Sequence, residues 1–284
     1  MVLVSFDPQR FGPMALSPKQ IEQKVADVGV AKAEMAPARA FVLAVMAGAF
    51  VGLGGMFMAL VKSDASLAPA ASSLLGGLAF SLGLCLVLVA GAELFTGNSL
   101  MVIGCMHGRY PWARLLASWS VVYVGNLAGA LLLVAFLAAA NYCGMNGGAV
   151  GATLVSVAVS KASLPWSVVF FRGVLCNALV CLAVWMGFAG KTVVDKFVAA
   201  ILPVMCFVAC GFEHCVANMF FLPMGVVARA LGFAAPGLDT SALCAAGMLG
   251  NLSAATLGNL LGGVVLVGLG YWFALGGERD DAAS

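Results

Sequence analysis

The sequence predicts an all-α membrane protein with six transmembrane helices, built as two inverted three-helix repeats in which the second and fifth helices are broken. Three observations support this prediction: an apolar composition, long apolar tracts separated by charged residues, and motifs that recur in the two halves. Of the 284 residues, 63% are hydrophobic and 9% are charged, whereas about a quarter of a soluble domain is charged. The mean hydropathy is +1.06, so we expect lipid to solvate most of the chain.

Residues 1–38 are expected to form a cytoplasmic segment that contains an amphipathic helix. Asp7 and Arg10 interrupt any apolar run near the start, so this start does not resemble a cleaved signal peptide. Ser17 followed by Pro18 is a helix-start signal. The apolar face of the helix would consist of Ile21, Val25 and Val28. Such a helix is expected to lie on the membrane surface.

Residues 39–276 are expected to form the transmembrane domain. The first tract, between Arg39 and Lys62, holds 22 uncharged residues, and a helix of this length rises roughly 33 Å, enough to cross a bilayer. The other five tracts lie after Asp64, after Arg114, around 165–190, after Lys196 and after Asp239. The two halves are then 39–140 and 164–276, and residues 277–284 form a cytoplasmic tail.

Two pairs of motifs recur in the same order. GNLAGALLLV begins at Gly125 and GNLLGGVVLV at Gly258; GAELFTGN spans 91–98 and GFEHCVAN spans 211–218. Internal repeats of this kind indicate duplicated structural units. Because three crossings are an odd number, the halves must insert with opposite orientation, which gives an aquaporin-like architecture.

The second and fifth tracts are too long and too polar for one straight helix each. Tract 65–106 holds 42 residues and tract 197–228 holds 32, against roughly 20 needed for a crossing. We expect 91–98 and 211–218 to be non-helical breaks, related by a pseudo-twofold axis in the membrane plane. The polar residues that recur in them are Glu93, Asn98, Glu213 and Asn218. The glutamates are interpreted as structural acceptors for backbone N–H groups, with proton or cation handling as the alternative.

Three further polar residues point to an anion pathway. His214 has an apolar counterpart, Leu94, in the first half, so the repeat does not require it. A neutral imidazole can donate a hydrogen bond to an anion and an imidazolium can lend a proton, and the sequence leaves both roles open. Lys161 and Arg172 lie near the start of the fourth tract, where their charge would attract anions to the outer mouth.

Lysines and arginines predict the orientation, because they gather in cytoplasmic loops. One side would carry ten of them and the other only Lys62, Lys161 and Arg229, so both termini are expected to be cytoplasmic. The nine cysteines contain no C-x-x-C pair and are interpreted as packed thiols, without metal or cofactor. The sequence contains none of the hydrolase or metalloprotease motifs, so we expect no enzyme. The net charge of +2 suggests no nucleic-acid partner.

The chain resembles the formate/nitrite transporter family. The resemblance rests on GAELFTGN, on YVGNLAGALL and on the run from Cys176 to Gly225, and it covers roughly residues 20–275. It implies a homopentamer in the cell inner membrane, in which each protomer has its own pore.

The resemblance also implies roles for single residues. The loop that breaks the second helix would help to gate the cytoplasmic side; it consists of Leu94, Phe95, Thr96 and Gly97. An apolar constriction toward the outside would be formed by Phe80, Leu84 and Phe207. His214 matches the central pore histidine, Asn177 its hydrogen-bonding partner, and Lys161 a lysine that attracts the anion. Arg172 departs from the pattern, because formate-type relatives have an apolar residue there and nitrite-type relatives a lysine.

The expected function is a channel or transporter for small monovalent anions. Formate is the first choice, moved with a proton as the neutral acid, and nitrite and hydrosulfide are the alternatives within the family. An aquaporin-like neutral-solute channel is less favoured, because such a channel would be expected to carry two Asn-Pro-Ala motifs and no Asn-Pro occurs in the sequence.

Overall fold

A computed structural model of the protein describes residues 15–276. The first 14 residues of the predicted N-terminal segment and the predicted tail, 277–284, lie outside the described residues. The described part of the chain contains helices and no β-strand, as predicted. Its first half contains α1 (Pro18–Ala33), α2 (Pro37–Lys62), α3 (Pro69–Phe80), α4 (Leu82–Leu86), η2 (Val87–Gly91), η3 (Gly97–Met101), α5 (Val102–Met106) and α6 (Trp112–Ala139). Its second half contains η4 (Tyr142–Gly148), α7 (Ala149–Ala162), α8 (Trp166–Ala189), α9 (Val193–Ala209), α10 (Cys215–Ala230), α11 (Ala245–Leu260), η5 (Leu261–Leu269) and α12 (Gly270–Leu275).

Six helical stretches of the described chain are long and apolar enough to cross a membrane. They are Pro37–Lys62, Pro69–Gly91, Trp112–Ala139, Tyr142–Ala162, Trp166–Ala189 and Ala245–Leu275. The fifth predicted tract, 197–228, is not among them because it is divided between α9, with 17 residues, and α10, with 16. Tyr142–Ala162 is an additional apolar helix that the sequence analysis did not predict.

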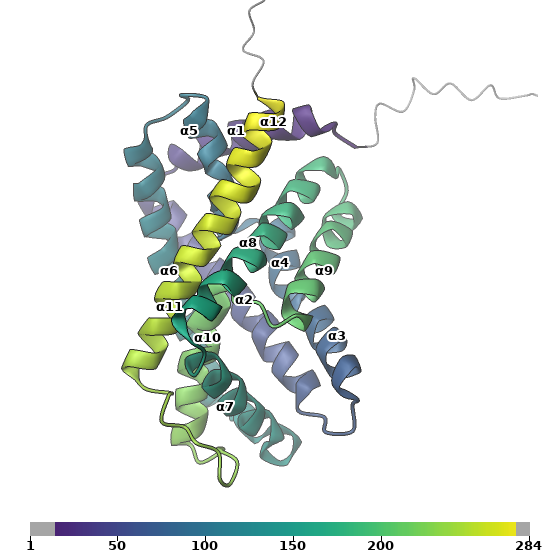
Figure 1. Ribbon diagram of the computed structural model, residues 1–284, viewed down its shortest axis with the longest axis vertical. Coiled ribbons are helices and arrows are strands. Elements are labelled where there is room, and N and C mark those ends of the chain that lie inside the picture. Colours follow the sequence, from purple (N-terminus) through teal and green to yellow (C-terminus); the bar gives the residue numbers. More distant parts are fainter. Residues whose placement is uncertain (1–14, 277–284) are drawn as a thin grey trace, which may run out of the picture.

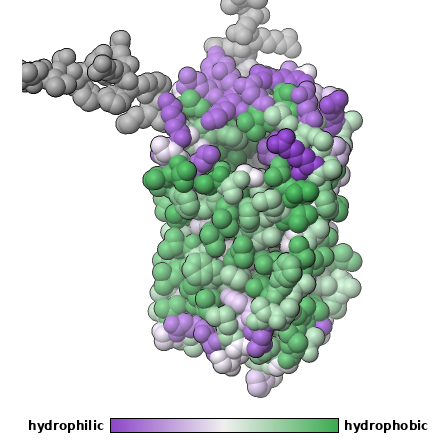
Figure 2. Space-filling model, turned by 180° about the vertical axis from the view of Figure 1, so that it is seen from behind, coloured by the Kyte–Doolittle hydropathy of each residue, from purple (hydrophilic) through white to green (hydrophobic). Residues whose placement is uncertain are grey.

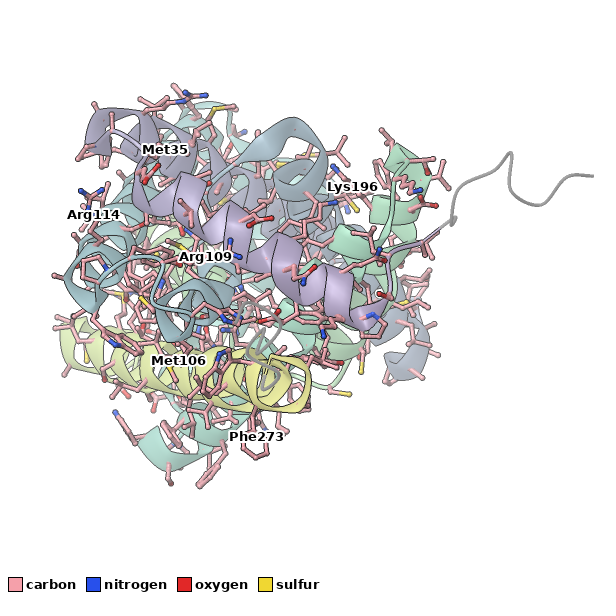
Figure 3. All side chains as sticks on the ribbon, turned by 90° about the horizontal axis from the view of Figure 1, so that it is seen from above. Met35, Met106, Arg109, Arg114, Lys196 and Phe273 are labelled. Atoms are coloured by element: carbon pink, nitrogen blue, oxygen red, sulfur yellow. The ribbon has the colours of Figure 1, made fainter. Side chains whose placement is uncertain are left out.

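The helices form an elongated bundle with distinct ends. Helices α1 and α12 lie at one end and α7 at the other, while α9 and α10 meet near the middle (Figure 1). Hydrophobic residues fill the middle of the face shown in Figure 2, and hydrophilic residues gather at its two ends. Helix α1 lies across its end of the bundle, where Arg109, Arg114 and Lys196 also lie (Figure 3). This distribution fits a polytopic membrane protein.

Helix α1 is packed onto the bundle. Ser17 begins it with a capping box, in which its hydroxyl accepts from the Gln20 N–H. Ile21 and Val25 of the predicted apolar face are buried, and Val28 is half-buried. Ion pairs join α1 to the segment after α5, from Glu22 to His107 and from Asp27 to Arg109. The helix therefore forms as predicted, with its apolar face against protein.

The side chain of Tyr110 packs against Gly29 of α1. A Cβ at Gly29 would lie 2.6 Å from the Tyr110 hydroxyl, so only glycine lets α1 approach this ring. Burial raises the pKa of the Tyr110 phenol, which keeps it a neutral donor, and its hydroxyl donates to the Met101 carbonyl at 2.5 Å. Through this contact α1 is held next to η3, immediately after the first break.

The predicted breaks are present but shorter than expected. Residues 92–96 and 210–214 are non-helical, whereas Asn98 lies in the 3-10 helix η3 and Asn218 lies in α10. Gly91 and Gly211 have φ angles of +80° and +69°, a region that glycine enters without a steric penalty. The glycine of each motif thus ends the first half-helix, and helix resumes before each motif is complete.

Matching hydrogen bonds show which helices of the two halves correspond. Asn126 accepts from the N–H of Phe95 and donates to the carbonyl of Ala44. Asn259 accepts from the N–H of Cys215 and donates to the carbonyl of Gly173. In the same way Glu93 N–H donates to the Leu43 carbonyl and Glu213 N–H to that of Arg172. These pairs align α2 with α8.

The same alignment pairs α1 with α7, because both end in a lysine that reaches the glutamate of the nearby break. The halves 39–140 and 164–276 therefore omit α1 and α7, and the contacts favour a longer repeat unit that includes them. Lys161 accordingly lies in the last turn of α7, rather than in a loop ahead of the fourth span.

The GNLAG and GNLLG motifs are the places where two helices of each half approach most closely. A Cβ at Gly129 would lie 1.9 Å from the Val45 carbonyl, and one at Gly262 would lie 2.1 Å from the Val174 carbonyl. No side chain fits at such distances, so the glycines permit backbone contact, as small residues commonly do between transmembrane helices. This contact brings the intervening asparagines to the breaks.

Candidate functional site

Two cavities reach toward the breaks from opposite ends of the bundle. The α1 vestibule, about 340 Å³, is lined by α1 and by both sides of the first break. The α7 vestibule, about 290 Å³, is lined by α7 and by the residues around the second break. Equivalent positions line the two cavities: Lys32 and Lys161, Glu93 and Glu213, Leu94 and His214. The two vestibules are therefore related by the same pseudo-symmetry as the two breaks.

Each break carries a buried glutamate held by a lysine and an asparagine. In the first half, Lys32 Nζ lies 2.9 Å from Glu93 Oε2 and 2.6 Å from Asn98 Oδ1, and Asn98 also donates to Glu93 at 2.8 Å. The Glu93 side chain is 9% exposed. Because a buried carboxylate is tolerated only when it is paired and hydrogen-bonded, the cluster fixes the shape of the break.

The second half contains the matching cluster with one addition. Lys161 Nζ lies 3.0 Å from Glu213 Oε1, and Asn218 donates to Glu213 Oε2 at 2.7 Å. Asn251 adds a bond to Glu213 and another to the Lys161 carbonyl. Among the described residues, Asn218 Oδ1 is buried and has no hydrogen-bond partner. In the described part of the chain both carboxylates therefore accept from lysine and asparagine side chains, and not from the backbone N–H groups that the sequence analysis expected.

The motif asparagines clamp the breaks from the other side. Asn126 accepts from Phe95 N–H at 3.0 Å and donates to the carbonyls of Ala44 and Glu93. Asn259 accepts from Cys215 N–H at 2.8 Å and donates to the carbonyls of Gly173 and Glu213. Each asparagine thus satisfies two main-chain groups at its break, an N–H and a carbonyl, and ties them to a carbonyl of the neighbouring continuous helix, α2 or α8.

His214 lines the α7 vestibule and connects the second break to the first through Thr96. Its Nε2 lies 2.9 Å from the Thr96 hydroxyl, and its Nδ1 accepts from the Ala217 N–H at 3.1 Å, which caps α10. An Nδ1 that accepts carries no proton, so the neutral ring has its proton on Nε2, directed at Thr96. Protonating Nδ1 would place positive charge against the N-terminus of α10. The geometry therefore favours a neutral hydrogen-bond donor over an imidazolium that lends a proton.

Apolar side chains surround this polar pair. Phe207 stacks on His214 with ring centroids 5.9 Å apart, and Phe80 meets Phe207 edge-on at 6.0 Å. Phe80 and Phe207 line the α7 vestibule, and their assignment to a constriction stays a prediction. Leu84 lines the α1 vestibule together with Leu94, so it does not belong to the α7 side as the sequence analysis expected. These four side chains belong to one buried cluster, which we call the apolar collar, and Phe207 joins it to the His214–Thr96 pair.

Two predicted site residues occupy other places. Phe95 lines neither vestibule: its ring packs against Trp119 and Tyr123 of α6, and only its N–H is used, in the clamp of Asn126. Adjacent residues of an extended break point to opposite sides, which explains why Leu94 faces the α1 vestibule and Phe95 does not.

Asn177 does not contact His214. Its amide donates to the Thr96 carbonyl at 3.2 Å, to Ser99 Oγ at 3.1 Å and to the Asn259 carbonyl at 2.6 Å. The hydrogen-bond partner of His214 is Thr96, and Asn177 positions Thr96 through its main chain.

The sequence analysis missed Lys32 and Lys62. Lys32 was counted only as an orientation signal, although it lines the α1 vestibule and pairs with Glu93. Lys62 was treated as the end of the first span, and it lines the α7 vestibule. The spacing between the lysine and the motif glutamate gave no signal, because it is 61 residues in one half and 52 in the other.

The cysteines form no site. Within residues 15–276 no group of three histidine, cysteine or acidic residues is placed to hold a metal ion. Six cysteines are buried as packed thiols, but Cys206, Cys210 and Cys244 are exposed, so the packed interpretation is wrong for these three.

Comparison with known proteins gives one consistent family. The family model described as formate/nitrite transporter matches residues 19–273. The chain is 37% identical over 276 residues to the formate channel FocA of Escherichia coli K12, covering 93% of this chain and 96% of that protein. It is 37% identical over 239 residues to the nitrite transporter NirC of Salmonella typhimurium LT2, covering 82% of each. A solved structure described as a pentameric formate channel with formate bound superimposes with a TM-score of 0.75 at 36% identity, covering 84% of this chain and 97% of that one.

Proposed function

The chain belongs to the formate/nitrite transporter family, and we propose that it carries formate across the membrane through the two vestibules and the collar between them. The observation that carries this proposal is the His214–Thr96 pair inside the apolar collar. Because the Nε2–H of His214 is directed at Thr96, the buried pair offers the Thr96 O–H to a small solute, and it offers the Nε2–H as well when the solute replaces Thr96 as its acceptor.

Lysines attract the anion into the vestibules and the collar selects its protonation state. A carboxylate loses its hydration among Phe80, Phe207, Leu84 and Leu94, and such a loss costs several kcal/mol for a bare charge. Desolvation favours the neutral form of a carboxylic acid. We therefore propose that formate crosses the collar as the neutral acid, after taking a proton from water in the vestibule, while His214 Nε2 and the Thr96 hydroxyl replace the lost hydrogen bonds.

Nitrite is the second candidate substrate, because NirC is 37% identical to this chain. Nitrite and formate are both small, planar and monovalent, so the vestibules suit either. The geometry gives hydrosulfide less support, since a single sulfur makes fewer hydrogen bonds to the pair at the collar.

The pathway also suggests the assembly and the orientation. Both vestibules and the collar lie within one chain, so a pentamer like that of the solved formate channel would contain one pathway in each protomer. Arg109, Arg114 and Lys196 lie at the α1 end (Figure 3), which favours a cytoplasmic α1 vestibule and cytoplasmic termini in a bacterial inner membrane.

The test is flux into liposomes that contain the purified protein. Formate, nitrite and hydrosulfide are supplied separately at equal concentration, and uptake is compared with that of protein-free liposomes. The proposal expects formate to be taken up fastest and nitrite at a comparable rate. If only hydrosulfide were taken up, hydrosulfide would be the substrate and the proposal for formate would be wrong. If none of the three were taken up, the proposal would also be wrong.

A further inference from the structure

The two vestibules are equivalent in structure but differ in charge. The charged residues that line the α1 vestibule are Lys32 and Glu93, which cancel. The charged residues that line the α7 vestibule are Lys62, Lys161, Arg172 and Glu213, a net charge of +2. The ion pair of each repeat accounts for one lysine and one glutamate, so the excess comes from Lys62 and Arg172.

Arg172 faces this cavity with most of its donors unused. Within residues 15–276 it forms no ion pair, and its one hydrogen bond runs from Nη1 to the Gly211 carbonyl at 3.3 Å. A guanidinium carries five N–H donors in a planar fork. The single bond to the carbonyl of Gly211, which lies in the second break after the end of α9, holds the fork beside that break and leaves its remaining donors available.

The repeat shows that the fold does not need this side chain. The equivalent residue in the first half is Leu43: its carbonyl accepts from Glu93 N–H as the Arg172 carbonyl accepts from Glu213 N–H. Both residues line their vestibules. The main chain therefore performs the shared structural task in each half, and the arginine side chain is an addition specific to the α7 vestibule.

The fork defines the chemistry of a ligand. Two parallel N–H groups of a guanidinium match two oxygens of a planar oxyanion, and this bidentate contact is stronger and more selective than attraction to a point charge. Formate and nitrite present two such oxygens, whereas hydrosulfide and chloride present a single atom. Lys62 and Lys161 would strengthen attraction to any anion without this preference.

We propose that the α7 vestibule contains a binding site for planar monovalent oxyanions in which Arg172 supplies the bidentate contact. The site holds the anion before it reaches Phe207 and His214. It rests on the proposed function, which it refines from small anions to those with two oxygens in a plane. The site also makes the affinity for the anion higher in the α7 vestibule than in the α1 vestibule, where the equivalent residue is Leu43.

Two substitutions separate the fork from the charge. Arg172→Lys keeps the positive charge and removes the fork; Arg172→Leu copies the first half and removes both. KM is measured for formate and for hydrosulfide, each supplied on the α7 side of vesicles with one known orientation. A charge-assisted bidentate contact at a half-buried site corresponds to about a tenfold change in affinity.

For Arg172→Leu we expect KM to rise about tenfold for formate and about threefold for hydrosulfide, the smaller figure being that of a screened charge alone. For Arg172→Lys we expect KM to rise about threefold for formate and to stay unchanged for hydrosulfide. Lys62→Met is the matched control, because it removes a charge from the same cavity. It should change KM for formate and KM for hydrosulfide by the same factor. KM for formate supplied on the α1 side should not respond to any of the three.

Two results would overturn the site. An Arg172→Leu protein with wild-type KM for formate on the α7 side would show that Arg172 binds no anion. Equal effects of Arg172→Lys on formate and hydrosulfide would show that only charge matters. Failure of the proposed function looks different, because the wild-type protein would then carry no formate; if it carried nitrite instead, the same comparison is made with nitrite. Size-exclusion chromatography of each variant shows whether assembly is intact.

Discussion

Replacing Asn259 by leucine tests the asparagine clamp quantitatively. The side chain makes three hydrogen bonds with main-chain groups, to Cys215 N–H at 2.8 Å and to the carbonyls of Gly173 and Glu213 at 2.8 and 2.9 Å. Hydrogen bonds between membrane helices contribute about 0.6 to 1.7 kcal/mol each. Leucine has nearly the same shape and forms none of them, so Asn259→Leu should lower the unfolding free energy by roughly 2 to 5 kcal/mol.

The inverted repeat supplies a replicate within the same chain. Asn126 makes the three equivalent bonds, to Phe95 N–H and to the carbonyls of Ala44 and Glu93. Asn126→Leu should therefore lower the unfolding free energy by a similar amount. The assay is unfolding by SDS titration in mixed micelles, followed by circular dichroism, with Ser120→Ala as the control because Ser120 is exposed and bonds only within its own helix. Losses below about 1 kcal/mol in both asparagine variants would refute the clamp, since even two bonds of about 0.6 kcal/mol each would exceed this amount.

Three further predictions concern the pathway and its packing. His214→Asn should keep the cap on Ala217 N–H, because asparagine is a good N-cap, and should lower formate flux while leaving its pH profile between about pH 5 and 8 unchanged; a flattened profile would instead make imidazole the proton donor. Lys161→Ala should lower both formate flux and stability, because it leaves Glu213 buried without its cation. Adding Glu213→Gln should restore stability but not flux. If the single variant were as stable as the wild type, the ion pair would not stabilise the protein. Gly129→Val should prevent assembly on size-exclusion chromatography, because its Cβ would overlap the Val45 carbonyl, whereas Gly250→Ala, in open space, should assemble normally.

The features that the sequence predicted well depend on local pattern. Apolar tracts bounded by charges located five of the six long apolar helices of the described chain. The paired Gly-x-Glu motifs located both breaks, because a break needs a residue free to adopt positive φ and a polar group to hold it. The recurrence of GNL near the third and sixth spans likewise predicted the repeat, although only the coordinates show that its asparagine reaches the break.

The features that the sequence did not predict depend on contacts between distant segments. Helix α7 was missed because its window, Tyr142–Ala162, has a mean hydropathy of 1.3 against 2.1 for Pro37–Lys62, and because it begins in a glycine-rich turn. The role of Lys32 was missed because α1 was treated as a surface helix, and nothing in the sequence places its last turn beside Glu93. Phe95 was assigned to the gate with its neighbours because a sequence motif does not show which side of an extended segment a residue faces.

The position of Lys161 differs from the expectation for a physical reason as well. The sequence analysis expected Lys161 only to attract anions at the outer mouth, a role in which its removal would affect flux alone. In the structure its ammonium group is paired with a carboxylate whose side chain is 3% exposed. A lysine of this kind both attracts an anion and neutralises a buried glutamate, and the two effects are separated only by changing both partners.

The most direct test of the account measures formate and proton movement together in liposomes that contain the wild-type protein. If formate passes the collar as the neutral acid, each formate taken up brings one proton, and the rate does not depend on the membrane potential. His214→Asn should slow this movement and preserve the one-to-one ratio. Formate uptake that follows the membrane potential without proton movement would show that the bare anion passes Phe80, Phe207, Leu84 and Leu94, and would contradict the account.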